Sequence, residues 1–224
     1  AVAPGAPTIG TATAGDASAT VTFSVPASAG GSSITGYTVT SNPGGHTGTG
    51  SGSPITVTGL TNGVSYTFTV TATNAASLTG GASTPSNSVT PKGLQTITFA
   101  NPGAQTFGTS PNLSILGGGA SATSGLTVTF TSSTTGVCTV TSGGVLTFLA
   151  TGTCTINADQ AGDTSYLAAT QVSRSFTVNA TVPDAPTIGT ATAGDTQATV
   201  AFSAPASNGG SSITGYTVTV SPAD

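Results

Sequence analysis

Apolar and hydroxyl residues alternate along much of the chain with a period of two. In the segment 64–73, Tyr66, Phe68 and Val70 share one parity, and threonines occupy the other. The same alternation recurs in three further segments: 19–23, 37–40 and 55–58. Because successive side chains of a strand point to opposite faces, this pattern predicts strands with an apolar face and a hydroxyl face. Clusters of Gly, Pro, Asn and Ser separate the segments, which predicts an all-β fold of packed β-sandwiches.

A long internal repeat organises these strands. The sequence APTIGTATAGD at 6–16 recurs unchanged at 185–195, and GGSSITGYTVT at 30–40 recurs unchanged at 209–219. Both pairs are offset by 179 residues, and 32 of the 42 residues from Pro4 to Gly45 match their partners. A shared fold alone requires far less identity, so we interpret the chain as part of a tandem array.

Proline-containing joints divide the chain into three predicted units. The first covers residues 1–92 and the second covers 93–180. The third, 181–224, repeats only the first half of the first unit. With strands of about seven to nine residues, each complete unit would be on the order of 25–30 Å long.

The composition excludes several kinds of protein. Charged residues make up 4% of the 224 residues, with Lys92 and Arg174 the only basic ones, and the net charge is −4. Thr (48) and Ser (28) account for about a third of the chain, whereas Glu, Met and Trp are absent. This argues against a helical bundle, against nucleic-acid binding and, without an 18-residue apolar run, against a membrane span. The opening AVAPGAP resembles a linker, so we expect a chain cut or processed from a longer one.

The first unit resembles a fibronectin type III domain. The resemblance rests on the ATVTF strand at 19–23, on GGSSITGYTVT at 30–40 and on TGLTNGVSYTFTVTATN at 58–74. It implies a seven-stranded sandwich with a tyrosine corner, in which Leu60 and Tyr66 occupy the family spacing and the tyrosine hydroxyl bonds back to the preceding loop. The family usually has Trp in the second strand, where this chain has Phe23 and, in the third unit, Phe202.

The second unit resembles the immunoglobulin-like repeats of large bacterial secreted and surface proteins. The segments that carry this resemblance are GLTVTFTSSTTGVCTV at 125–140 and GTCTINADQAGDTSYLAA at 152–169. They contain the only two cysteines, Cys138 and Cys154, each at an apolar position. We expect a disulfide and therefore an oxidising compartment outside the cytoplasm. Two free buried thiols, or a partial metal site, are the alternatives.

Residues suited to catalysis or to cofactor binding are few and scattered. His46, the only histidine, lies in a glycine-rich loop and is expected to be a solvated turn residue. Asp159 and Asp163 form the only close acidic pair, which fits a polar corner better than a calcium site because a calcium site needs more oxygen ligands. We therefore expect no catalytic, metal or cofactor site. Asn112 and Asn179 begin possible glycosylation sequons.

The third unit would expose an apolar layer without a second half. Val200, Phe202, Ile213, Tyr216 and Val218 would lie on three strands with nothing opposite them. We expect the chain to continue beyond residue 224 with a segment resembling 46–92, and strand addition by another chain is the alternative.

These features favour a non-catalytic structural segment of a large exported bacterial protein. Its expected setting is an extracellular filament or an adhesin stalk, and its expected partners are neighbouring copies of itself, with a cell-surface or glycan target also open. The alternative is a spacer or carbohydrate-contacting module of a secreted polysaccharide hydrolase. Tyr166 is the candidate exposed aromatic contact for that role. An enzyme is not expected.

Overall fold

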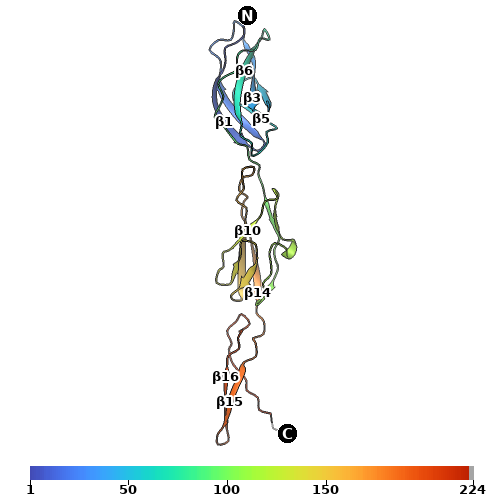
Figure 1. The fold of residues 1–224 in the computed structure, drawn as a ribbon, viewed down its shortest axis with the longest axis vertical. Helices are drawn as coiled ribbons and strands as arrows, with labels where there is room; N and C mark the ends of the chain where they lie inside the picture. Colours follow the sequence, from blue (N-terminus) through green and yellow to red (C-terminus); the bar gives the residue numbers. More distant parts are fainter. Residues whose placement is uncertain (222–224) are drawn as a thin grey trace. The chain divides into compact units, whose positions relative to one another are not determined.

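The computed structural model describes residues 1–221, and these residues form strands joined by loops (Figure 1). A single 3-10 turn, Leu116–Gly118, is the only helical element in this part of the chain. The all-β fold class predicted from the alternation is therefore confirmed. Two compact units are distinguished: Ala1–Gln95 together with Ala161–Ala169, and Thr96–Gln160 together with the chain from Thr170 onward. No helix within residues 1–221 is long and apolar enough to cross a membrane.

The first unit is a sandwich of two three-stranded antiparallel sheets. One sheet has the order β1-β2-β5 and the other β4-β3-β6. Their bounds are β1 (Thr8–Gly15), β2 (Ser18–Ser24), β3 (Ile34–Asn42), β4 (Thr47–Gly50), β5 (Ile55–Thr58) and β6 (Thr67–Asn74). Strands β1, β3, β5 and β6 are labelled in Figure 1.

Alternate side chains of these strands turn inward to make the core of the first unit. On β6 the apolar residues are fully buried while the threonines between them are half-buried. The core contains thirteen residues from both sheets and the loops beside them: Ala12, Ala19, Val21, Phe23, Tyr37, Val39, Ile55, Val57, Leu60, Tyr66, Phe68, Val70 and Ala72. Burial of apolar surface between two layers is thus the main source of stability in this unit.

The seventh strand implied by the family resemblance is present only in irregular form. The segment 80–89 runs beside β6, and the backbone amides of Ser83 and Ser86 donate to the carbonyls of Val70 and Phe68. The two serine hydroxyls accept hydrogen bonds from the Val70 and Phe68 amides in return. Side-chain oxygens thereby replace backbone acceptors, and Pro85 has no amide to donate. The segment therefore holds the edge of the sheet without forming a regular ladder.

Two asparagine side chains supply hydrogen bonds that the backbone cannot make to itself. Asn74, which is 1% exposed, donates to the carbonyls of Val2 and Ala29. Its Oδ1 accepts from the amides of Ala76 and Leu78. Every polar group of this amide is satisfied, so a buried polar residue joins the N-terminal segment, a glycine loop and the end of β6.

Asn87 acts in the same way on β1. Its side chain accepts a hydrogen bond from the Ala12 amide and donates to the Ala12 carbonyl. The β1–β2 register shifts between Ile9 and Ala12, so this part of β1 lies at an irregularity of the ladder. A side-chain amide thus takes the place of a neighbouring strand at the bulge.

The second unit contains small antiparallel sheets and one parallel pair. Its largest sheet has the order β10-β13-β14-β8, with β8 parallel to β14, and two-stranded sheets join β7 to β9 and β11 to β12. The bounds are β7 (Ile97–Phe99), β8 (Gln105–Thr106), β9 (Ala120–Ala122), β10 (Thr129–Ser132), β11 (Cys138–Val140), β12 (Leu146–Phe148), β13 (Gly152–Asp159) and β14 (Val172–Asn179). Phe99 packs edge-on against Phe130, with 5.5 Å between ring centroids.

The predicted third unit, from residue 181 onward, falls within the second compact unit, and its described residues contain one hairpin. Strands β15 (Thr187–Ala193) and β16 (Ala198–Ser203) pair with the same bulge that occurs between β1 and β2. The prediction of a third strand here was wrong within the described residues, because the segment from Ile213 to Ser221 has no strand structure. Its counterpart β3 pairs with β4 and β6, and neither of these strands has a counterpart in residues 181–221. An extended segment without a ladder partner cannot form a sheet.

We expect the variant Asn74→Ala to destabilise the first unit by about 2–4 kcal/mol, because it leaves buried backbone carbonyls and amides without partners. Chemical denaturation followed by far-UV circular dichroism measures this change. Ser51→Ala, in an exposed loop, is the matched control and should leave the midpoint unchanged. Equal midpoints for the two variants would contradict the role given to Asn74.

Candidate functional site

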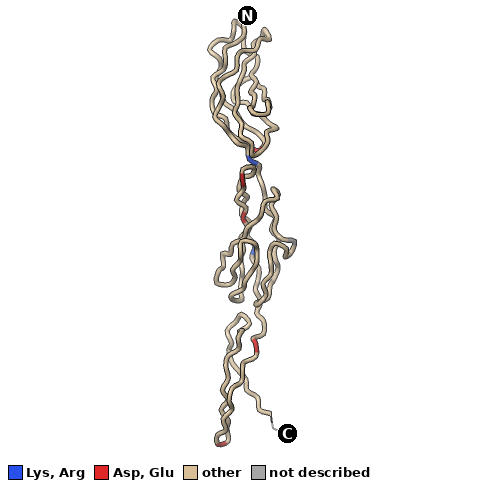
Figure 2. Tube along the Cα trace, in the orientation of Figure 1, with Lys and Arg blue, Asp and Glu red and all other residues tan. Residues whose placement is uncertain are grey.

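Titratable residues do not converge on a reactive centre in the part of the chain that the structure describes. Charged residues are few along the trace (Figure 2), and within residues 1–221 no three His, Cys, Asp or Glu side chains are placed to hold a metal ion. His46, expected to be solvated, is half-buried just before β4, and its ring lies edge-on to that of Tyr66 with 6.2 Å between centroids. This arrangement suits packing rather than acid–base chemistry, which requires a substrate-accessible base.

The acidic pair forms turns rather than an ion site. One Asp163 carboxylate oxygen accepts hydrogen bonds from the backbone amides of Ser165 (2.7 Å) and Tyr166 (2.8 Å). Asp159 instead accepts a hydrogen bond from the side-chain amide of Gln171. Asp163 thus stabilises a turn of the backbone, as short polar side chains commonly do, whereas Asp159, at the end of β13, binds a side chain.

The segment 161–169 belongs to the first unit and binds the chain around Gly93. The Gly93 amide donates to the Ser165 carbonyl at 2.8 Å, and the Leu167 amide donates to the Gly93 carbonyl at 2.9 Å. The Lys92 ammonium donates to the Asp163 carbonyl at 2.6 Å. This strap was not foreseen from the sequence, because its contacts join residues about seventy positions apart and carry no local pattern.

Tyr166 lies within this strap. Its ring is half-buried, and two of its carbons lie about 3.2 Å from the position that a Cβ atom on Gly93 would take. A bulkier residue at position 93 would therefore collide with the ring. A sugar-stacking platform needs an open aromatic face, and this ring is half-buried beside Gly93.

Tyr66 and Leu60 support the turn before β6. Both side chains are 3% exposed, and the Tyr66 hydroxyl accepts a hydrogen bond from the Thr61 amide at 3.1 Å. The Tyr66 backbone also exchanges hydrogen bonds with Val89. The geometry is that of a hydroxyl bonding back to the loop before its own strand.

Cys138 and Cys154 form a disulfide between β11 and β13. Both are fully buried, and their sequence separation is 16. The hydroxyls of Ser132 and Thr134 lie 3.5 Å and 3.4 Å from the Cys138 sulfur. The bond joins two different sheets inside the core, so it is structural and not an exposed redox pair.

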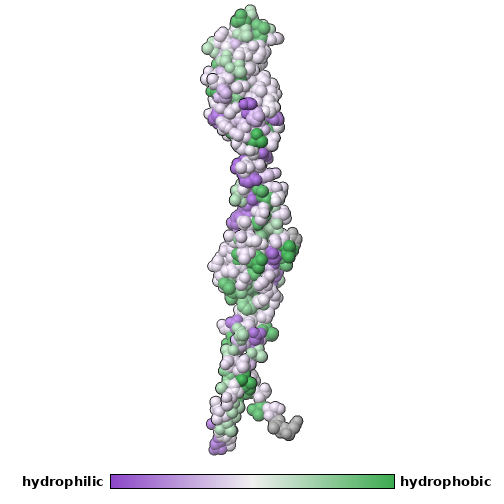
Figure 3. Space-filling view, viewed as in Figure 1, coloured by the Kyte–Doolittle hydropathy of each residue, from purple (hydrophilic) through white to green (hydrophobic). Residues whose placement is uncertain are grey.

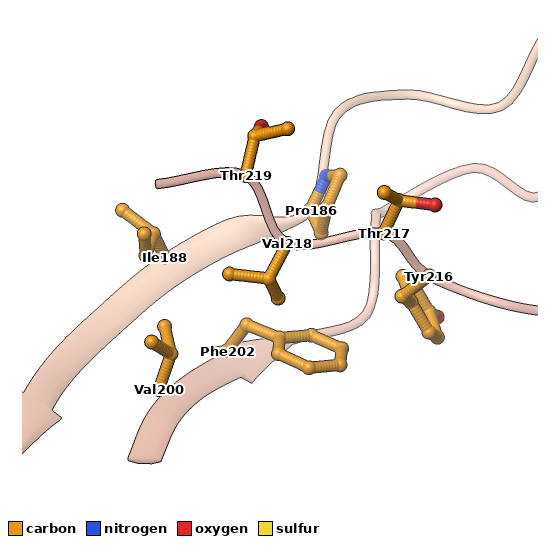
Figure 4. A pocket seen from close by; sticks show the side chains of 8 residues that line it. All are labelled: Pro186, Ile188, Val200, Phe202, Tyr216, Thr217, Val218 and Thr219. Atoms are coloured by element: carbon orange, nitrogen blue, oxygen red, sulfur yellow. The ribbon is translucent and has the colours of Figure 1, made fainter. Parts of the chain in front are cut away.

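An exposed apolar surface lies on the hairpin of β15 and β16 and on the segment that follows it. A hollow of about 220 Å³ is bordered by Ile188, Val200, Phe202, Tyr216 and Val218, among others. Figure 4 shows Val218 and Tyr216 directed toward the hairpin, whereas Thr217 and Thr219 point away from it. Green apolar patches are visible on this part of the surface in Figure 3.

This surface repeats, residue for residue, a surface that is buried in the first unit. Phe202 and Tyr216 have ring centroids 4.7 Å apart at 52°, and their counterparts Phe23 and Tyr37 have centroids 4.8 Å apart at 50°. The exposures differ, at 42% and 43% in the repeat against 7% and 4% in the first unit. The two ring pairs therefore pack alike, but only the pair Phe23–Tyr37 in the first unit is buried.

Comparison with known proteins agrees with the two-sheet architecture of the first unit. The fibronectin type III domain family matches residues 3–90. A search of curated proteins found no match. The first unit, with its two antiparallel sheets and buried tyrosine, belongs to the β-sandwich class, and its residues 3–90 match the fibronectin type III family.

Several solved structures resemble parts of the chain. A crystal structure of a multidomain segment of titin is 28% identical, with 41% of this chain and 33% of that one covered and a TM-score of 0.37. The kinase region of twitchin from C. elegans is 25% identical, with 40% and 17% covered and a TM-score of 0.36. A titin module from human cardiac muscle is 30% identical, with 39% and 89% covered and a TM-score of 0.32. The chain therefore spans a third or less of the first two structures.

The repeat supplies a matched pair of substitutions. We expect Phe23→Ala to destabilise the first unit by about 3–5 kcal/mol, because it removes a buried ring from a packed core. Phe202→Ala removes the corresponding ring from an open surface and should leave the unfolding of both units nearly unchanged. Thermal unfolding measured by calorimetry compares the two variants. A large loss of stability in Phe202→Ala would show that this face is covered in solution.

Proposed function

We propose that this chain is a non-catalytic structural segment of a large exported bacterial protein, and that it contributes to an extracellular filament or an adhesin stalk. The observation that carries the proposal is the near-identical repeat at 179 residues, which begins within a fibronectin type III domain. Duplicated modules with separate cores add length without adding a reaction centre.

The disulfide and the surface chemistry support the same setting. The buried bond between Cys138 and Cys154 fits an oxidising environment. Outward-facing threonines replace the charged residues of most protein surfaces, so neighbouring chains would repel one another weakly. These properties suit lateral or end-to-end association between copies of the chain.

A carbohydrate-contacting spacer is less well supported. That function needs an exposed aromatic platform, and Tyr166 is half-buried against Gly93. Among the described residues, the open hollow near Phe202 is apolar and contains no charged side chain. Sugar recognition depends on polar groups that fix the hydroxyls, and this hollow offers few of them.

The structural proposal is tested with chains that contain one, two or three copies of the 179-residue period. If the segment serves as a spacer, negative-stain electron microscopy should show particles whose length increases by the same amount with each copy. The purified chains, imaged in the same way at several protein concentrations, also show whether they assemble into filaments. Globular particles of unchanged length at every copy number would contradict the proposal.

Removal of the disulfide tests how much the bond between Cys138 and Cys154 stabilises the second unit. We expect Cys138→Ala/Cys154→Ala to lower the stability of the second unit by about 3 kcal/mol, since the unfolded chain regains the entropy of the closed loop. Urea denaturation is compared with and without reducing agent. The reducing agent should shift the midpoint of the natural chain and leave the double variant unchanged. If the reducing agent left the urea midpoint of the natural chain unchanged, and a thiol reagent modified both cysteines without reduction, the disulfide would be contradicted.

A further inference from the structure

The chain offers only two peptide bonds to an endopeptidase that cleaves after lysine or arginine, because Lys92 and Arg174 are its only basic residues. The ammonium of Lys92 donates to the Asp163 carbonyl at 2.6 Å. Both backbone polar groups of the next residue, Gly93, are paired with the strap, residues 161–169. An enzyme of the trypsin type takes the basic side chain into its own specificity pocket, and Lys92 is not free to enter one while the strap is closed.

The strap is attached to the first unit by hydrogen bonds rather than by buried apolar side chains. The core cluster of the first unit contains none of its residues. Leu167 is 47% exposed and Tyr166 is half-buried. Besides the bonds to Gly93, the side-chain amide of Gln95 donates to the Leu167 carbonyl at 2.6 Å. A segment with little buried apolar surface opens at a lower free energy than the core, so the strap can release while the sandwich stays folded.

Asp163 shapes the closed strap through its side chain and its backbone. One carboxylate oxygen accepts from the amides of Ser165 and Tyr166, and the Asp163 amide donates to the Tyr166 carbonyl at 3.0 Å. The Asp163 carbonyl is also the acceptor of the Lys92 ammonium. Hydrogen bonds to a carboxylate are stronger than those between neutral groups, so this residue contributes much of the strap's closed geometry.

We propose that the Lys92–Gly93 bond is a conditional cleavage site for a trypsin-type endopeptidase and that the strap controls access to it. Hydrolysis adds one water molecule across this bond, which leaves a carboxylate on Lys92 and an amino group on Gly93. Residues 90–96 form no strand, and Leu94 beside the bond is 72% exposed. Once the strap is released, this segment can therefore take the extended form that a protease binds. With the strap closed, the bond is protected.

The bond after Arg174 is protected differently, by the largest sheet of the second unit. Arg174 lies within β14, opposite Ile156 of β13. Its guanidinium donates to the carbonyls of Phe99 and Ser173. Strand β13 is also held by the disulfide through Cys154. A protease reaches this bond only after the sheet opens, so cleavage at Arg174 reports unfolding of the second unit and should be slower than cleavage at Lys92.

Limited proteolysis of the chain 1–224 with trypsin tests the proposal, with the fragments identified by mass spectrometry. Cleavage of the natural chain at Lys92 should be at least about 100-fold slower than cleavage of a synthetic peptide of residues 86–98, which lacks the strap. Asp163→Ala should accelerate it about 10- to 100-fold, because the loss of two hydrogen bonds to the carboxylate raises the fraction of chains with an open strap. Asp159→Ala is the matched control, since Asp159 binds Gln171 outside the strap, and should change the rate by no more than about twofold.

Two further variants separate strap release from loss of the whole fold. Tyr166→Ala removes the ring that lies beside Gly93 and should accelerate cleavage at Lys92 in the same way. Lys92→Gln removes the site, so cleavage at Arg174 alone should remain. In Asp163→Ala, the cleavage rate at Arg174 and the unfolding temperature measured by calorimetry should match those of the natural chain.

Three results would overturn the proposal. One is cleavage of the natural chain at Lys92 as fast as that of the free peptide. The second is an unchanged rate at Lys92 in both Asp163→Ala and Tyr166→Ala. The third is faster cleavage at both Lys92 and Arg174 together with a lower unfolding temperature, which would assign the effect to general unfolding.

Discussion

Burial of one apolar face between two β-sheets is the interaction on which the rest of this structure depends. A sheet with alternating apolar and hydroxyl residues is stable in water only when a second layer covers its apolar side. The first unit meets this requirement with two three-stranded sheets around thirteen buried residues. In the repeat beyond residue 180 the corresponding side chains Phe202 and Tyr216 are exposed among the described residues.

Polar side chains complete the first unit where the strands cannot. Asn74 joins three separate segments through four hydrogen bonds, and Ser83 and Ser86 accept from β6 in place of backbone carbonyls. Within the described residues, no buried side-chain nitrogen or oxygen lacks a partner. A chain with almost no charge can therefore reach a specific fold, since its amides and hydroxyls satisfy the irregular backbone.

Function follows from what these units contain and from how they are repeated. A fibronectin type III domain is a stable carrier for many functions, so the fold alone assigns none of them. In this chain Asp163 accepts hydrogen bonds from backbone amides and Asp159 from the side-chain amide of Gln171, and the two cysteines form a buried disulfide. These side chains stabilise the fold of the two units, and they do so through hydrogen bonds and one covalent bond.

The sequence by itself determined the fold class, the strand alternation and the repeat, because each depends on local periodicity or on counting; it predicted the disulfide but left free thiols open, and the structure contains the bond. The sequence missed the strap around Gly93 and the side-chain hydrogen bonds of Asn74, since these join distant residues that share no pattern. The identical sequences 30–40 and 209–219 show the limit most directly. The first contributes to strand β3 and the second to no strand. Only the tertiary structure decided between them, because a β-strand exists through the hydrogen bonds of its neighbours and not through its own residues alone.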